Sequence, residues 1–331
     1  MVGSGLSTDL SELINEGIKK RNRRALAKLL TIIERDPELL RGYYREVLSA
    51  EPKSKIIGIT GPPGVGKSSL INRLIKELRR GGNSVAVVAV DPASPLSGGS
   101  LLGDRVRVKE LDEGVFFRSM STPPNEDIPW KVILALELLN TAGFDYIILE
   151  HPGSGQTNVR VSDLVDLLVV VMQPLTGDDI QLIKAGVTEV GDVYVINKGD
   201  LPQAQFFFRV AESFIGKVGR DGVVPKVLLV SALNGTGIPE LASTINSMFE
   251  EMRESGVLGI RRFRRRVTEV YCLGLTYVKL LYDDVFNDFR KTELIKKVIK
   301  GEVDVLSAGE YVFKELIRRC CALKGSEVVN D

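Results

Sequence analysis

Short apolar runs alternate with longer amphipathic segments through the middle of the chain, from Lys55 onward. The runs are rich in β-branched or aromatic residues and are flanked by Gly, Asp or Pro. Most are separated by segments of helical length. This alternation predicts an open, mostly parallel sheet with helices on both faces. The predicted strands are Ile56–Thr60, Val85–Val90, Val115–Phe117, Tyr146–Leu149, Leu167–Met172, Val193–Ile196 and Val227–Val230.

The two ends of the chain have helical patterns instead. Before the first strand, Leu26, Leu29, Leu30 and Ile33 recur at helical spacing, and Pro37 begins a second helix. After about residue 255 the strand pattern stops, and we expect helices over Val267–Leu281, Thr292–Lys300 and Ala308–Leu323. The sequence therefore predicts an N-terminal helical extension (1–52), a central sheet domain (53–256) and a C-terminal helical region (257–331), with a soft boundary near Gly256.

A phosphate loop follows the first predicted strand. The segment Gly61-Pro62-Pro63-Gly64-Val65-Gly66-Lys67-Ser68 matches G-x-x-x-x-G-K-[ST] and precedes an amphipathic helix, Ser69–Arg80. Its glycines let backbone N–H groups surround an anion, and the helix N-terminus adds partial positive charge. We expect Lys67 to reach the β- and γ-phosphates, Ser68 to bind Mg²⁺, and the whole loop together with Ser69 to bind the nucleotide. The fold class predicted for residues 53–256 is thus an α/β P-loop nucleoside triphosphatase.

A second motif indicates which base is bound. Asn197-Lys198-Gly199-Asp200 closes the predicted strand Val193–Ile196, and the Asp200 carboxylate can accept two N–H bonds from the edge of guanine. Lys198 is expected to lie over the base, and Asn197 to tie loops together. The next strand ends in Ser231-Ala232-Leu233, whose backbone can contact the guanine O6. The order of these motifs favours GTP and GDP as ligands.

Three acidic residues are candidate Mg²⁺ ligands beside Ser68. Asp91 ends the second predicted strand, Glu150 ends the fourth, and Asp104 lies in the loop between residues 97 and 107. Carboxylates at the carboxyl ends of parallel strands stand where ligands bind in such sheets, and Mg²⁺ prefers oxygen donors.

Several segments together resemble the MeaB/ArgK family of P-loop GTPases, from about residue 15 to 250. They are Val90-Asp91-Pro92-Ala93-Ser94, Gly98-Gly99-Ser100-Leu101-Leu102-Gly103-Asp104, Glu150-x-x-Gly153-x-Gly155-Gln156, Gly177-Asp178-Asp179-x-Gln181-x-Ile183-Lys184 and Asn197-Lys198-x-Asp200. The chain departs from the family pattern at His151 and Pro152, which follow Glu150.

The resemblance implies a GTPase chaperone of a B12-dependent acyl-CoA mutase, chiefly of the methylmalonyl-CoA mutase type, that helps to load and protect the cobalamin cofactor. It also implies a homodimer. By the same resemblance, Gln156 and Lys184 are candidate catalytic or switch residues beside Lys67 and Glu150, because a Gln can orient water and a cation can offset charge on the phosphoryl group.

Two other functions stay open at this point. One is a phosphotransferase, since some members of the family were formerly described as kinases for amino-acid transport. The other is a cofactor-delivery GTPase with a different client, although proteins that carry metal ions usually have His- or Cys-rich stretches. This chain has one histidine, His151, and three cysteines.

The net charge and the lengths of the apolar runs limit the classes of binding partner that we expect. The net charge is +1, and no apolar run is long enough to span a bilayer, so we expect a cytoplasmic protein that binds neither nucleic acid nor membrane. Two basic clusters, at residues 19–24 and 261–266, could still bind an acidic partner. A solvated helix face or a dimer contact is the interpretation favoured for both.

Overall fold

The structure is a computed structural model that describes residues 3–48, 51–92, 113–122, 130–153, 157–174, 190–215 and 219–322. The chain forms two compact units, Met1–Thr268 and Glu269–Asp331. The first unit contains the sheet and the N-terminal helices. The second contains only helices among its described residues.

The sheet confirms the predicted fold class. Its strands pair in parallel in the order β3-β2-β4-β1-β5-β6-β7. Strands β2 and β3 run further than predicted, because they continue to pair with each other, up to Pro92 and Thr122, beyond the point where β4 ends. The strands are β1 (Lys55–Thr60), β2 (Val85–Pro92), β3 (Val115–Thr122), β4 (Tyr146–Glu150), β5 (Leu167–Met172), β6 (Val193–Ile196) and β7 (Lys226–Leu229).

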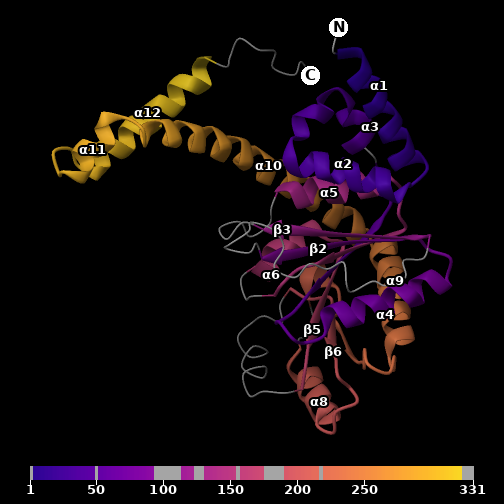
Figure 1. Ribbon diagram of the computed structural model, residues 1–331. Coiled ribbons are helices and arrows are strands. Elements are labelled where there is room, and N and C mark those ends of the chain that lie inside the picture. The colour runs from indigo at the N-terminus through magenta and orange to yellow at the C-terminus, as the bar shows by residue number, and fades with distance from the viewer. Residues whose placement is uncertain are drawn as a thin grey trace. The chain divides into compact units, whose positions relative to one another are not determined.

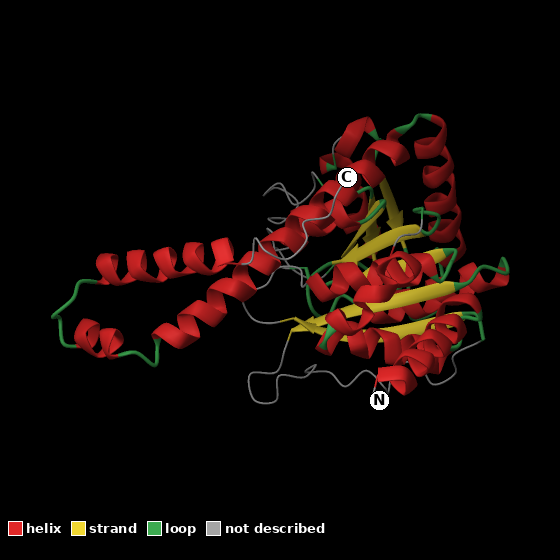
Figure 2. Cartoon of the chain, turned by 90° about the horizontal axis from the view of Figure 1, so that it is seen from above, coloured by secondary structure: helices red, strands yellow, loops and turns green. Residues whose placement is uncertain are grey.

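Alternate residues of each strand face two separate hydrophobic cores. In β1, Ile56 belongs to one core, whereas Ile57 and Ile59 belong to the other. The first core is covered by α5 (Trp130–Thr141), α6 (Thr157–Leu164) and α8 (Ala204–Phe214), and the second by α4 (Lys67–Arg80) and α9 (Ile238–Glu254). Figure 2 shows the strands between these helical layers.

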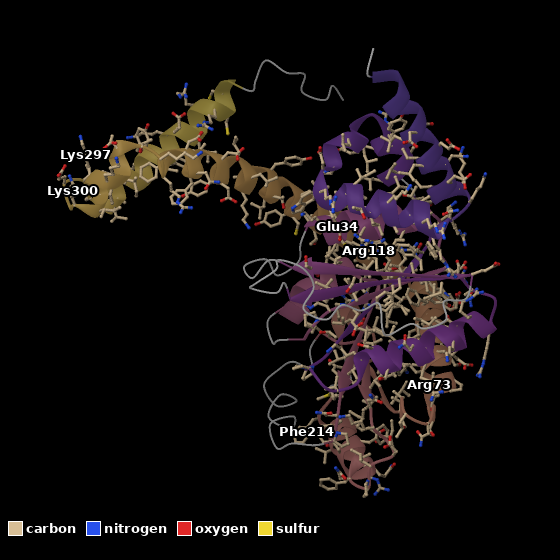
Figure 3. All side chains as sticks on the ribbon, viewed as in Figure 1. Glu34, Arg73, Arg118, Phe214, Lys297 and Lys300 are labelled. Atoms are coloured by element: carbon tan, nitrogen blue, oxygen red, sulfur yellow. The ribbon has the colours of Figure 1, made fainter. Side chains whose placement is uncertain are left out.

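The N-terminal helices pack outside α5 (Figure 1). They are α1 (Gly3–Ile14), the π-helical turn η1 (Asn15–Lys19), α2 (Arg23–Arg35), the 3-10 helix η2 (Pro37–Tyr43) and α3 (Tyr44–Leu48). Arg21 joins this layer to the sheet, because its guanidinium donates to the Ala142 carbonyl at 2.8 Å and to the Ser84 hydroxyl at 3.0 Å. On β3, Arg118 also pairs with Glu34 of α2 (Figure 3). Arg21, although exposed as predicted for the first basic cluster, thus also makes a structural contact that the sequence does not predict.

The second basic cluster also differs from the prediction. Arg261 and Arg265 are almost fully buried, and they pair with Asp192 and Asp166, respectively, at 2.8 and 2.7 Å. Their partners lie in loops before β6 and β5, far away in the sequence. The favoured interpretation of a solvated helix face or dimer contact is wrong for these two arginines.

The helix α10 (Val257–Phe289) is longer than the predicted segment Val267–Leu281 and runs from the first unit into the second. It begins directly after α9, where Gly256 has a φ of +79°. The second unit adds α11 (Glu293–Ile299) and α12 (Val305–Ala322). Its small core consists of Val285, Phe289, Ala308, Val312 and Leu316. Among the described helices, none is both long and apolar enough to cross a membrane.

Candidate functional site

The phosphate loop joins β1 to α4 at the carboxyl edge of the sheet. Helix α4 begins at Lys67, and Gly66 precedes it with a φ of +93°, a left-handed conformation that favours glycine. The Lys67 ammonium donates to the carbonyls of Gly61 at 2.7 Å and Pro62 at 3.0 Å. The loop thus curls around the lysine amine, with the helix N-terminus behind it, and this arrangement suits an anion.

Asn197 connects the phosphate loop to the base-reading loops. Its Nδ2 donates to the Val65 carbonyl at 2.7 Å, and its Oδ1 accepts the Ala232 N–H at 3.0 Å. A Cβ on residue 66 would lie 2.5 Å from Nδ2, so only glycine at position 66 allows this approach. The asparagine that the sequence predicts as a tie between loops therefore contacts two of them.

A cavity of about 360 Å³ lies between these loops. Asp200 stands at its wall and accepts a hydrogen bond from the Ser231 hydroxyl, while Lys198 donates to Gln173. The lining residues are Gly66, Ser69, Asn197, Lys198, Asp200, Ala232 and Leu233, and the sequence predicts all of them as nucleotide-binding. The cavity thus brings the phosphate loop, the N-K-x-D motif and the loop after β7 together.

The candidate metal ligands lie at the same edge. The Ser68 hydroxyl donates to the Glu150 carboxylate at 2.8 Å. Asp91 is on the neighbouring strand β2, two positions beyond Ala89, the partner of Glu150. The side chain of Asp91, and all of Asp104, Gln156 and Lys184, lie outside the described residues. The described donors, a hydroxyl and a carboxylate beside the phosphate loop, are oxygen ligands of the kind that Mg²⁺ takes.

The loop after Glu150 touches the phosphate loop directly. The N–H of Gly153 donates to the Gly61 carbonyl at 3.0 Å, and a Cβ on residue 153 would lie 2.6 Å from the Gly61 nitrogen. His151 is 4% exposed, and its backbone N–H extends the pairing with β1 by donating to Ile59. The histidine thus occupies a packed position next to the phosphate loop.

Two residues beside the site belong to no recognisable sequence motif. Arg73 of α4 donates to the carbonyls of Ala232 and Leu233, at 3.2 and 2.7 Å, and Gln173 follows β5 and accepts from Lys198. Arg73 is exposed and lies six residues after Lys67, the start of an amphipathic helix, where a basic residue is ordinary. Only the tertiary structure distinguishes it from the other arginines of α4.

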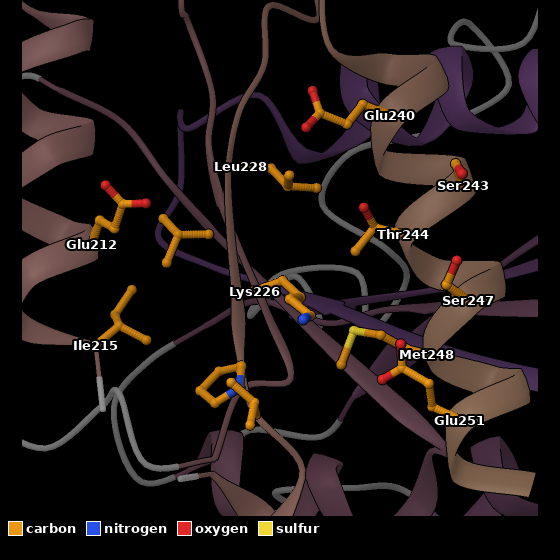
Figure 4. A pocket seen from close by; sticks show the side chains of 13 residues that line it. Glu212, Ile215, Lys226, Leu228, Glu240, Ser243, Thr244, Ser247, Met248 and Glu251 are labelled. Atoms are coloured by element: carbon orange, nitrogen blue, oxygen red, sulfur yellow. The ribbon is translucent and has the colours of Figure 1, made fainter. Parts of the chain in front are cut away.

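A second cavity of about 570 Å³ lies between α8, β7 and α9, away from the motifs. Figure 4 shows Glu212 and Ile215 across from Glu240, Thr244 and Glu251. None of the residues that line it belongs to the predicted nucleotide site.

Comparison with known proteins agrees with the geometry. A protein of Pyrococcus abyssi named as a GTPase is 38% identical over 317 residues, covering 93% of this chain and 97% of that protein. A fused isobutyryl-CoA mutase of Nocardia farcinica is 38% identical over 190 residues, covering 55% of this chain and 18% of its own. The crystal structure of a LAO/AO transport system kinase matches with a TM-score of 0.66 and 26% identity, over 96% of this chain and 99% of that one.

Residues 26–286 match the model of one family, the methylmalonyl Co-A mutase-associated GTPase MeaB. This match spans most of the chain, including the phosphate loop, the Asn197–Asp200 motif and the loop after β7. The chain therefore belongs to the MeaB family and is a GTPase.

Proposed function

We propose that this GTPase depends on Mg²⁺ and acts as a chaperone of a B12-dependent acyl-CoA mutase, helping to load and protect its cofactor. The observation that carries the proposal is the family itself, which is named for association with methylmalonyl Co-A mutase. The fused isobutyryl-CoA mutase supports it, because part of that single chain resembles this GTPase. A domain that is part of the same chain as a mutase in one protein can be expected to bind a mutase when it is a separate chain.

In the proposed nucleotide complex, the phosphate loop binds the phosphates and the cavity receives the guanine. The Lys67 ammonium moves from the carbonyls of Gly61 and Pro62 to the β- and γ-phosphate oxygens, where its charge is better compensated. Asp200 accepts the guanine N1 and N2 hydrogens, and Asn197 holds the surrounding loops in register. The position of each group at the carboxyl edge of the sheet supports these roles.

Ser68, Asp91 and Glu150, with Asp104, would hold Mg²⁺ directly or through water. When bound, the ion would supply positive charge that neutralises the negative charge developing on the phosphates during hydrolysis. Glu150 also directly precedes the His151-Pro152-Gly153 turn that contacts Gly61, so a change at the γ-phosphate can reach this turn through the carboxylate. Gln156 and Lys184 remain proposed catalytic residues on the family resemblance.

We also propose that the chain works as a homodimer. The second unit exposes many large apolar side chains on α10 and α12, and exposed apolar surface of this kind usually marks a protein contact. Val270, Tyr271, Tyr277 and Val278 of α10 and Val305, Leu306 and Phe313 of α12 are each more than half exposed. Light scattering of the purified chain would give its mass in solution, and a monomer at micromolar concentration would contradict this proposal.

Affinity capture tests whether the client protein is an acyl-CoA mutase. The tagged chain, loaded with GDP or with a non-hydrolysable GTP analogue, is used to capture proteins from an extract of its own source. The proposal expects an acyl-CoA mutase subunit in the eluate, in an amount that differs between the two nucleotides. A matched column carrying the Asp200→Asn variant, which should not retain guanine nucleotide, controls for binding that is independent of nucleotide. Recovery of no mutase with any column would refute the client assignment.

A second measurement separates hydrolysis from phosphotransfer. GTP labelled in the γ-phosphate is incubated with the protein and Mg²⁺, with and without the captured partner. A GTPase chaperone releases the label as inorganic phosphate. Stoichiometric transfer of label to an amino acid or a protein would favour a kinase.

A further inference from the structure

The guanidinium of Arg73 clamps the loop that follows β7. Its Nε donates to the Ala232 carbonyl at 3.2 Å, and its Nη2 donates to the Leu233 carbonyl at 2.7 Å. Arg73 is on α4, the helix that begins at the phosphate loop, and is labelled in Figure 3. One side chain of the phosphate-binding helix thus holds two successive peptide groups of the base-reading loop.

The orientation of these carbonyls fixes the orientation of the next N–H. In a trans peptide the C=O of one residue and the N–H of the following residue point in opposite directions, and the described residues contain no cis peptide. Since the Ala232 carbonyl points at Arg73, the Leu233 N–H points away from α4. Leu233 lines the guanine cavity, and its side chain is 76% exposed there.

The remaining contacts of the loop hold the neighbouring donors. Asn197 Oδ1 accepts the Ala232 N–H at 3.0 Å, and the Ser231 N–H donates to the Thr236 carbonyl at 2.9 Å. The Ser231 hydroxyl donates to Asp200, which links the loop to the carboxylate that reads N1 and N2. Arg73 is therefore the contact that sets the peptide plane carrying the Leu233 N–H.

We propose that Arg73 is a positioning residue for recognition of the guanine O6: it orients the backbone N–H groups of the loop after β7, Leu233 above all, toward that oxygen. Arg73 does not touch the base. The proposal rests on the assignment of Asp200 and of residues 231–233 as the guanine-reading groups, and it adds a residue outside the known motifs to that machinery. It also explains why the helix after the phosphate loop carries a cation at this position, with its two donors aimed at carbonyls.

The test compares Arg73→Ala with Arg80→Ala. Arg80 is the matched control because it lies on the same helix, is exposed, and pairs only with Glu77 at 2.6 Å among the contacts of the described residues. Dissociation constants are measured for GDP, for IDP, which lacks the 2-amino group, and for 6-thio-GDP, which keeps N1–H and the 2-amino group but carries sulfur in place of O6. Thermal unfolding of both variants checks that each folds.

The Arg73→Ala variant should bind GDP and IDP about 10-fold more weakly than the wild-type chain, because two charge-assisted hydrogen bonds that hold the loop are lost. Its loss for 6-thio-GDP should be clearly smaller, since sulfur is a poor acceptor and the contact is already weakened. Arg73→Lys, with one ammonium that can reach a single carbonyl, should fall between. Arg80→Ala should bind all three ligands like the wild-type chain.

Equal losses for GDP, IDP and 6-thio-GDP would overturn the proposal, because they would mean that Arg73 supports the fold of the site without a specific effect on O6. Unchanged GDP binding in Arg73→Ala would also overturn it. The guanine-reading assignment fails in a distinguishable way: the wild-type chain itself would then bind GDP no better than ADP.

Discussion

Arg261 and Asp192 form an ion pair in the interior of the first unit, with Nη2 2.8 Å from Oδ1 and both side chains 1% exposed. The same guanidinium donates to Asp221 and to the backbone carbonyl of Asp166, and Arg220 binds the second carboxylate oxygen of Asp192. Asp166 directly precedes β5, and Asp192 directly precedes β6. The first turns of α10 are thereby fixed to the amino ends of these two strands, at the edge of the sheet opposite to the nucleotide site.

Replacing Arg261 with Met should destabilise the first unit by about 3–5 kcal/mol, because Asp192 would remain buried with less compensation of its charge. Urea unfolding followed by circular dichroism measures the change. The control is Arg253→Met on α9, whose side chain is 68% exposed and pairs with Glu250, and its expected cost is below about 1 kcal/mol. Equal midpoints for the two variants would contradict a structural role of the buried pair.

A pH-dependent contribution to stability is expected from Asp145, which lies just before β4. Burial by itself raises the pKa of the Asp145 carboxyl. Hydrogen bonds from the Ser84 hydroxyl and N–H, together with the charge of Arg21, lower the pKa by more than burial raises it, so the pKa lies below its usual range. A carboxyl with a depressed folded-state pKa stabilises the fold fully above its unfolded pKa of about 3.9, and this contribution is lost as the pH falls through the folded-state pKa.

Asp145→Asn should therefore lower the free energy of unfolding at pH 7, and the gap to the wild-type chain should narrow below about pH 4. Urea titrations at pH 7 and pH 3 measure both differences. Glu254→Gln, which removes an exposed carboxylate outside this cluster, should leave the two curves parallel. A gap for Asp145→Asn that is the same at both pH values would show that the loss comes from altered hydrogen bonding alone.

The sheet and the nucleotide loops could be predicted from the sequence because their signals are local. Each strand is a short apolar run whose alternate residues face two cores, as Ile56 and Ile57 do in β1. Once all strands are parallel, their carboxyl ends meet at one edge. The segments after β1, β6 and β7, which are far apart in the sequence, then come together around Asn197 without further information.

The arginines could not be predicted, because their roles depend on partners that are distant in the chain. Arg261 lies in a run of basic residues that is typical of a solvated helix face, and its buried partner Asp192 is 69 positions away. Arg73 and Arg80 are both polar positions of one amphipathic helix, yet only Arg73 faces the carbonyls of the base-reading loop. The full length of β2 and β3 could not be predicted from the sequence either, because it depends on the pairing of these two strands with each other.

Specificity for guanine should depend on Asp200, which stands at the wall of the cavity and accepts from Ser231. In Asp200→Asn the amide no longer accepts both N–H groups of guanine, but its NH₂ can donate to the 2-oxo group of xanthine. The affinity for GDP should fall by at least about 100-fold, while xanthosine diphosphate should bind better than it does to the wild-type chain.

Competition binding with the two diphosphates measures this exchange. Glu212→Gln is the matched control, because it neutralises an acidic side chain that lines the second cavity and should change neither affinity. If Asp200→Asn bound GDP as tightly as the wild-type chain, the carboxylate would have no part in reading the base.

The last prediction concerns Glu150, whose carboxylate accepts the Ser68 hydroxyl at 2.8 Å at the end of β4. In the proposed mechanism this pair holds Mg²⁺ near the γ-phosphate, a group that GDP lacks. Glu150→Ala should therefore reduce the rate of GTP hydrolysis by about 100-fold or more, whereas its affinity for GDP should change by less than about 5-fold. It should also raise the Mg²⁺ concentration that gives half-maximal hydrolysis.

Single-turnover hydrolysis at saturating GTP isolates the chemical step, and titration with a fluorescent GDP measures binding. Glu77→Ala is the control, since Glu77 is an acidic residue of α4 that pairs with Arg80 and, in the contacts of the described residues, touches no residue of the site. If Glu150→Ala kept the wild-type turnover number, Glu150 would be removed from the mechanism. If it instead lost GDP binding and hydrolysis to the same extent, its hydrogen bond to Ser68 would serve to hold the phosphate loop rather than to support the chemical step.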